Sequence, residues 1–124
     1  MNKKILVFFI ITIIAIVAVI FYKGYFSPTI QSGTEHTVEL GDIGFYPQSI
    51  TIKKGDTVTF TTKRKSHFWP ASNLHPSHTI YPEFDPQEPV DPKDSWSFKF
   101  KKTGTWRYHD HLSPYFTGTV TVEE

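Results

Sequence analysis

Residues 102–122, KTGTWRYHDHLSPYFTGTVTV, decide the fold of this chain, because alternating polar and apolar residues there flank a bend. The pattern predicts two paired strands, residues 105–109 and 117–122, since successive side chains of a strand point to opposite faces. One face then carries Trp106, Tyr108 and Asp110, and its aromatic residues indicate that it is the core face. His109 and His111 are predicted to project together from the other face, at the end of a strand.

The composition limits the classes of function. The chain has 124 residues, which is one small domain plus attachments, and 13 Lys and Arg balance 12 Asp and Glu. Near-neutral charge without a basic run argues against nucleic acid as a partner. There is no cysteine, and the only methionine is the initiator. Any metal site must therefore be built from imidazole and oxygen ligands.

The N-terminus predicts attachment to a membrane. Residues 5–22 form an apolar run that is about long enough to cross a bilayer as a helix. Residues 1–4 contain Lys3 and Lys4, which favours a cytoplasmic N-terminus and an extracytoplasmic C-terminal domain. The prediction is a single-pass signal anchor in the cell membrane, and a cleaved signal peptide is the alternative.

Residues 23–35 are a polar, turn-rich linker, and residues 36–124 form the globular domain. Strands are expected at residues 36–40, 49–53, 58–60, 95–101, 105–109 and 117–122, and the turn at Gly55 and Asp56 is interpreted as a hairpin. Six or more short strands predict an all-β sandwich. Residues 63–92 are a long loop whose aromatic residues predict that it packs on the end of the sandwich.

Two segments support a more specific interpretation. Residues 49–60, SITIKKGDTVTF, are followed by a histidine, an aromatic strand, and the pattern Gly-Thr-Trp-x-Tyr-His that begins at Gly104. This order, which covers almost the whole domain, resembles the cupredoxin family. The resemblance implies a Greek-key β-sandwich that binds copper at one end.

The blue-copper site of that family does not carry over. The family pattern Tyr-x-Cys-x-x-His-Pro-x-Met-x-Gly, placed on the segment from Tyr108 to Gly118, puts Asp110 at the cysteine, Ser113 at the histidine and Phe116 at the methionine. The remaining family histidine corresponds to His67. A blue-copper site requires a cysteine thiolate, so blue-copper electron transfer is excluded.

A narrower likeness concerns residues 104–111, GTWRYHDH, which are similar to the Gly-Thr-x-x-Tyr-His-x-His segment of multicopper oxidases. In those proteins both histidines contribute to coppers at an interface between domains. The likeness implies that His109 and His111 are ligands, and it implies no oxidase activity.

Other residues are candidates to complete a site with this pair. His75 and His78 lie in the long loop with Glu83 and Asp85 close behind, and His67 lies at the start of that loop. The candidate metal ligands are His67, His75, His78, His109, His111 and Asp110, with copper as the expected ion and zinc as the alternative. We expect Asp110 to pair with His67 in the absence of metal. His36 is expected to be solvated on the first strand, and structural roles remain the alternative for all the other histidines.

Two functions from different classes follow. The first is a membrane-anchored, extracytoplasmic cupredoxin-like protein that binds copper through histidines. The second is a metal-free cupredoxin fold that serves as a protein-interaction or structural module, with the long loop as its contact surface. A homo-oligomer that shares His109 and His111 between subunits would join the two. No nucleophile or acid–base pair at a recognised spacing indicates an enzyme.

Overall fold

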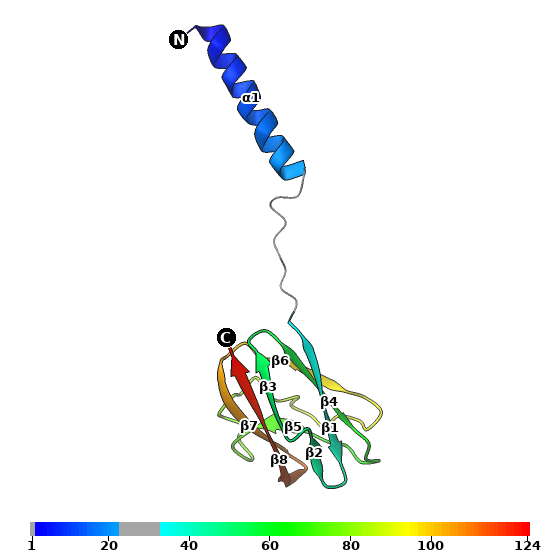
Figure 1. Ribbon diagram of the computed structural model, residues 1–124. Helices are drawn as coiled ribbons and strands as arrows, with labels where there is room; N and C mark the ends of the chain where they lie inside the picture. Colours follow the sequence, from blue (N-terminus) through cyan, green and yellow to red (C-terminus); the bar gives the residue numbers. More distant parts are fainter. Residues whose placement is uncertain (1, 23–32) are drawn as a thin grey trace. The chain divides into compact units, whose positions relative to one another are not determined.

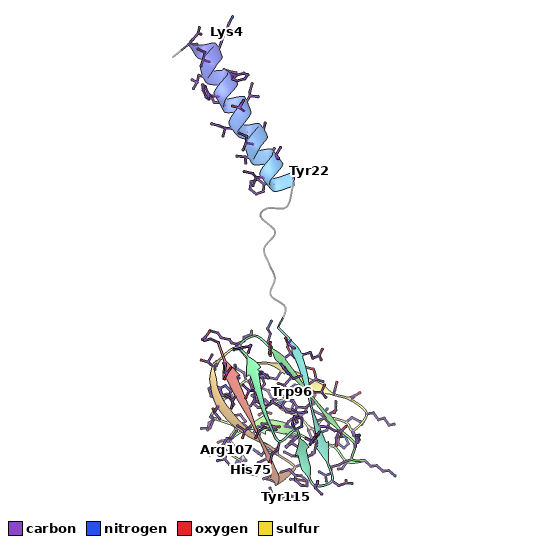
Figure 2. All side chains as sticks on the ribbon, viewed as in Figure 1. Lys4, Tyr22, His75, Trp96, Arg107 and Tyr115 are labelled. Atoms are coloured by element: carbon purple, nitrogen blue, oxygen red, sulfur yellow. The ribbon has the colours of Figure 1, made fainter. Side chains whose placement is uncertain are left out.

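The computed structural model describes residues 2–22 and 33–124, which belong to two separate compact units (Figure 1). The first contains helix α1 (Lys3–Tyr22), whose 20 residues are apolar on every side after the initial Lys3 and Lys4, except for Thr12, and include none that is buried (Figure 2). It is long and apolar enough to cross a membrane, although a signal sequence has the same character. Residues 23–32 of the expected linker lie outside the described part.

The second unit is a β-sandwich of two four-stranded sheets (Figure 1). Its strands are β1 (Glu35–Gly41), β2 (Gly44–Tyr46), β3 (Ser49–Lys53), β4 (Thr57–Thr62), β5 (Pro70–Ser72), β6 (Trp96–Lys99), β7 (Gly104–Asp110) and β8 (Ser113–Glu123). One sheet has the order β2-β1-β4-β6 and the other has the order β3-β8-β7-β5. The predicted all-β sandwich is confirmed.

Aromatic side chains fill the space between the sheets. Phe60, Phe84 and Tyr108 are almost completely buried, and the rings of Phe60 and Tyr108 meet edge to face at 5.3 Å. Ring pairs of this geometry add to the stabilisation from buried apolar area. Phe84 belongs to the long loop, so the prediction that this loop packs onto the sandwich with its aromatic residues is confirmed.

Strand β7 connects the two ends of the sandwich. Its first residue, Gly104, pairs with Val122 near the C-terminus, whereas its last residue, Asp110, pairs with Ser113 at the far turn. The chain enters the domain at that first end, where the N–H of Thr34 donates to Asp56 at 2.7 Å. The segment around His109 and His111 therefore lies at the end of the sandwich away from Thr34, where the chain enters the domain, and from Val122 near the C-terminus.

The hairpin prediction at Gly55 and Asp56 is wrong. β3 pairs in parallel with β8, and β4 pairs in parallel with β1, so this turn connects the two sheets. The Asp56 carboxylate ties the turn to the start of β1, because it accepts the N–H groups of Lys53 and Thr34. His36 also contacts it, with 2.9 Å between Nε2 and Oδ2, so His36 is paired and not simply solvated.

Gly118 is required by the close approach of β8 to the core. It lies opposite Tyr108, and an added Cβ would come within 2.3 Å of the Tyr108 ring. We expect Gly118→Ala to lower the free energy of unfolding by about 1–3 kcal/mol, because the rigid buried ring cannot move away. Gly41→Ala is the matched control, since its nearest neighbouring atom is 3.8 Å away.

Urea unfolding of the full-length protein in mild detergent measures this difference. All three tryptophans lie in the sandwich, so their fluorescence reports on the domain alone. Equal unfolding midpoints for the two variants would contradict the packing argument.

Candidate metal centre

Four histidines from two distant segments converge at one end of the sandwich. One ring nitrogen from each of His75, His78, His109 and His111 lies within 4.8 Å of the other three. His78 and His109 are buried, His111 is half-buried and His75 is exposed. Four imidazoles gathered in this way, without a lysine or arginine among them, are a set of donors suited to a transition metal.

Strand pairing brings the two segments together. β5 lies antiparallel beside β7, with Ala71 opposite His109. The loop that leaves β5 therefore starts next to the histidine segment, and hydrogen bonds hold it there, including one of 3.0 Å from the N–H of Asn73 to the carbonyl of Arg107. The sequence pattern explains the other pair, because His109 and His111 are two residues apart and share a face.

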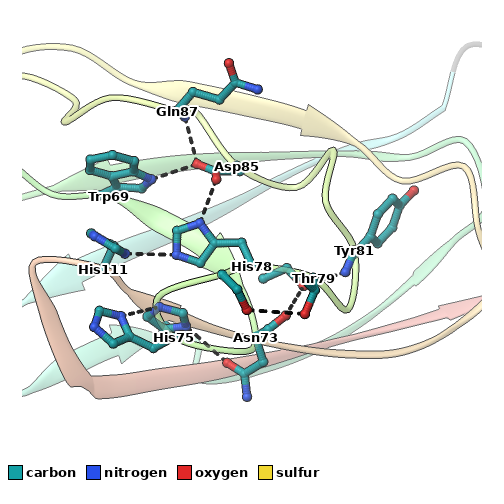
Figure 3. Close-up of polar contacts among 12 residues, drawn as sticks. Trp69, Asn73, His75, His78, Thr79, Tyr81, Asp85, Gln87 and His111 are labelled. Atoms are coloured by element: carbon teal, nitrogen blue, oxygen red, sulfur yellow. Dashed lines mark hydrogen bonds and ion pairs between the residues drawn. The ribbon is translucent and has the colours of Figure 1, made fainter.

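Two of the four rings are oriented through the nitrogen that points away from the cluster (Figure 3). Nδ1 of His78 is 2.6 Å from Oδ2 of Asp85, and Nδ1 of His109 is 3.1 Å from Oδ1 of Asn73. A histidine that binds metal usually donates its other N–H to such an oxygen, which fixes the ring and its tautomer. With the proton on Nδ1, the Nε2 atom of each of these two rings carries a lone pair that is directed into the cluster.

Asp85 is itself held as a carboxylate. Burial raises its pKa, but hydrogen bonds from His78, the N–H of Gln87 and the indole of Trp69 lower the pKa further, so the net shift is downward. The indole Nε1 donates to Oδ1 at 2.8 Å (Figure 3). The ring of Trp69 also packs against His111, with centroids 4.5 Å apart, so one aromatic residue positions both the carboxylate and a histidine.

The remaining two rings face these lone pairs. Nδ1 of His75 is 3.2 Å from Nε2 of His109, and Nδ1 of His111 is 2.9 Å from Nε2 of His78. Both contacts are hydrogen bonds only if His75 and His111 carry their protons on Nδ1. Moving each proton to Nε2 would present four lone pairs, so metal could bind without a net release of protons from neutral rings.

The surroundings keep two of the histidines neutral. Burial, followed by repulsion from His78, His75 and His111, lowers the pKa of His109 to about 4. Burial and repulsion from His78 and His75 also lower the pKa of His111. Because neutral imidazole is the form that binds metal, these two donors stay available in mildly acidic solution.

The donor set fits a metal that accepts four imidazoles. Bonds from imidazole nitrogen to such ions are ~2.1 Å long, so the nitrogens need only a small inward movement from their present separations. The set lacks the thiolate that a blue-copper site requires.

Two of the six candidate ligands lie outside the four-histidine group. His67 is about half exposed, with Nε2 3.9 Å from a carboxylate oxygen of Asp91. Asp110 is fully buried and accepts the N–H of Trp69 at 2.7 Å and that of Leu112 at 3.4 Å. The expected pair of Asp110 and His67 is therefore not formed.

Arg64 takes the place of His67 beside Asp110. Its Nη1 is 3.9 Å from Oδ2 of Asp110, and its guanidinium lies over the ring of Phe116, 5.4 Å from the centroid. The positions that correspond to the blue-copper cysteine and methionine thus contact a permanently charged guanidinium, which needs no proton to balance the buried carboxylate.

Sequence reasoning missed the two orienting contacts. Asp85 was noted only as an oxygen donor near the loop, and Asn73 was not considered. Asp85 lies seven residues after His78 and Asn73 lies 36 residues before His109, so neither spacing is a recognisable motif. Only the packed loop brings each pair together.

The domain family follows from a match over nearly the whole chain. Residues 10–122 match the model of the cupredoxin-like domain. The chain belongs to the cupredoxin-like domain family. No curated protein is similar enough to the chain to count as a match.

Solved structures agree with this assignment. A purple cupredoxin from Nitrosopumilus maritimus is 21% identical, with a TM-score of 0.62, over 71% of this chain and 99% of that one. A mutant plastocyanin of fern is 25% identical, with a TM-score of 0.56, over 70% and 99%. A copper-containing nitrite reductase from Thermus scotoductus is 20% identical, with a TM-score of 0.59, over 73% of this chain but 22% of that one.

Asp110 is predicted to hold the turn between His109 and His111. Asp110→Ala removes the acceptor of a buried N–H and leaves Arg64 without its carboxylate, so we expect a loss of about 1–3 kcal/mol in unfolding free energy. Asp110→Asn keeps one carbonyl oxygen for the N–H of Trp69 and should cost less. Urea unfolding compares the two variants, and a larger loss for the asparagine variant would contradict this role.

The lowered pKa of His109 predicts how stability without metal depends on pH. Unfolded histidine takes up a proton near pH ~6.5, whereas folded His109 does so only near pH 4. Between these values the unfolded state binds more protons, so the free energy of unfolding should fall as the pH is lowered from about 6.5 to 4. Urea unfolding in the presence of a chelator measures this slope.

His109→Gln is the control for this dependence on pH. It removes the titrating ring, so it should make the slope shallower whatever it does to the absolute stability. His111, whose pKa is also lowered, should account for part of the remaining slope. An unchanged slope in the glutamine variant would show that His109 is not the group responsible.

Proposed function

We propose that this chain is a membrane-anchored, extracytoplasmic cupredoxin-like protein that binds one copper ion through His75, His78, His109 and His111. The observation that carries the proposal is the convergence of four imidazole nitrogens from two segments, with Asp85 and Asn73 orienting two of the rings. α1 would supply the anchor, and the two lysines that precede or begin it favour a cytoplasmic N-terminus.

Copper is favoured over zinc by the donor set. Nitrogen sites bind Cu²⁺ more tightly than the other first-row divalent ions, in the usual order of affinities. The bound ion would supply a redox-active or transferable centre, and the residues of this chain would hold it, exclude water from His78 and His109, and keep His109 and His111 neutral. Without a thiolate, the centre would not act as a blue-copper electron carrier.

A titration of the full-length protein in mild detergent, made without a polyhistidine tag, tests the proposal. We expect one equivalent of Cu²⁺ to bind with sub-micromolar affinity, more tightly than Zn²⁺, and without the intense visible absorption of a copper–thiolate bond. The His109→Ala/His111→Ala double variant should lose this binding, because it removes half of the donors. Calorimetry measures the two affinities, and visible absorption spectroscopy tests for the copper–thiolate band.

The matched control is the His36→Ala/His67→Ala double variant, which removes two histidines that lie outside the group. It should bind copper as the unaltered protein does. If both double variants bind equally, or if the unaltered protein binds no copper, the proposed site is wrong.

The second candidate is a metal-free module that binds another protein. It is supported by exposed apolar side chains in or next to the turns at the same end of the sandwich: Ile43, Tyr46, Leu112 and Tyr115. It is also supported by the hydrogen bonds between the histidine rings, which satisfy the cluster without an ion. Absence of copper binding would favour this candidate.

A further inference from the structure

His75 differs from the other three histidines in what holds its ring. It is exposed, and among the described residues its only hydrogen bond from the ring is the 3.2 Å contact of Nδ1 with His109, inside the cluster. Among the rings of the described residues, that of His75 contacts those of two other histidines, His109 at 5.2 Å and His111 at 4.7 Å between centroids. Figure 2 places His75 towards the edge of the domain.

The other three rings are each fixed by a group outside the cluster. Asp85 holds His78 and Asn73 holds His109. The ring of His111 packs against Trp69, and the backbone N–H of His111 donates to the backbone carbonyl of Trp69 at 2.8 Å. These three histidines are therefore oriented whether or not an ion is bound, which is the arrangement expected of permanent ligands.

The backbone around His75 also distinguishes it from the other three histidines. The base of its loop is fixed, because the N–H of Ile80 donates to the carbonyl of Asn73 at 2.8 Å and the N–H of His78 donates to the carbonyl of Leu74. His75 lies between these anchored points, and its neighbour Leu74 is 58% exposed. Turning the ring of His75 outwards would break its contacts with His109 and His111 but none of the contacts by which Asp85, Asn73 and Trp69 orient the other three rings.

We propose that His75 is the exchangeable ligand of the copper site, and that His78, His109 and His111 form a permanent set of three. This inference rests on the proposed function. Copper leaves or enters when an incoming donor, such as an imidazole or thiolate of an acceptor, takes the place of His75. The first step would be a substitution of ligands with no change in oxidation state, in which the bond from copper to His75 breaks and one bond to the new donor forms. Release would follow when further donors of the acceptor replace the three remaining bonds to nitrogen.

Copper release into excess EDTA tests this inference on the full-length protein in detergent. We expect His75→Ala to keep one equivalent of copper and to release it at least about tenfold faster than the unaltered protein, since a water or a chelator can occupy the vacant position at once. His78→Ala should abolish stoichiometric binding, because it removes a donor of the permanent set. His78→Gln, which keeps a polar side chain near Asp85, repeats the test if the alanine variant unfolds.

A second measurement tests whether His75→Ala leaves a vacant coordination position on copper. Added azide should change the electron paramagnetic resonance spectrum of copper-loaded His75→Ala at concentrations that leave the spectrum of the unaltered protein unchanged. His67→Ala removes an exposed histidine outside the cluster and should alter neither release nor spectrum.

The outcomes separate the two proposals. Loss of binding in His75→Ala equal to that in the His78 variants, or release at the unaltered rate, overturns the exchange role while copper binding itself stands. Absence of copper binding by the unaltered protein instead overturns the proposed function.

Discussion

The antiparallel pairing of β5 with β7 is the constraint on which the candidate site depends. It places Ala71 opposite His109, so the chain that leaves β5 has to begin beside the histidine segment of β7. The loop then covers the outer face of β7, which is why His109 is only 2% exposed although it points away from the core. A three-residue strand thus turns a partly exposed sheet face into an enclosed cluster.

The two faces of β7 separate the residues of the core from those of the candidate site, so that either set can change in sequence without changing the other. Tyr108 points into the sandwich, where it packs against Phe60 and Gly118, whereas His109 points outwards to the loop. The register shifts between His109 and Asp110, where the chain turns towards β8. Asp110 shares the inward face of Tyr108 by alternation and accepts the N–H of Trp69, while His111 lies on the same side as His109.

Patterns within a strand were the predictable part of this molecule. Alternation in residues 104–111 was enough to place Tyr108 inwards and the two histidines outwards, and the family resemblance was enough to give the sandwich. The prediction of a hairpin at Gly55 and Asp56 failed because the sequence of a short turn between two apolar strands is the same whether these strands pair with each other or with other strands. The pairing of β3 and β4 is determined by β8 and β1, which lie in other parts of the sequence.

The site was predictable only where its parts were close in sequence. The pair of His109 and His111 and the pair of His75 and His78 were both identified, but their meeting depends on β5, which lies inside the expected loop and has no alternating pattern. His67 was included because a family histidine occupies the corresponding position. Arg64 reaches the buried Asp110 instead, and its guanidinium carries a permanent charge, whereas a histidine is charged only when it is protonated.

The four-histidine cluster lies at the same end of the sandwich as the positions that the resemblance assigns to the blue-copper cysteine and methionine, but on the other face of β7. Once Asp110, Arg64 and Phe116 occupy the place that the resemblance assigns to a thiolate and a thioether, that place offers only oxygen, a cation and a ring. The adjoining face of β7 has nitrogen donors that are already neutral, because burial lowers the pKa of His109 and His111. The buried Asp110 and the guanidinium of Arg64 fill the space next to the core, whereas four imidazoles converge on the outer side of β7. The nitrogen atoms that could hold a metal therefore lie on the outer face of this strand and not between the sheets.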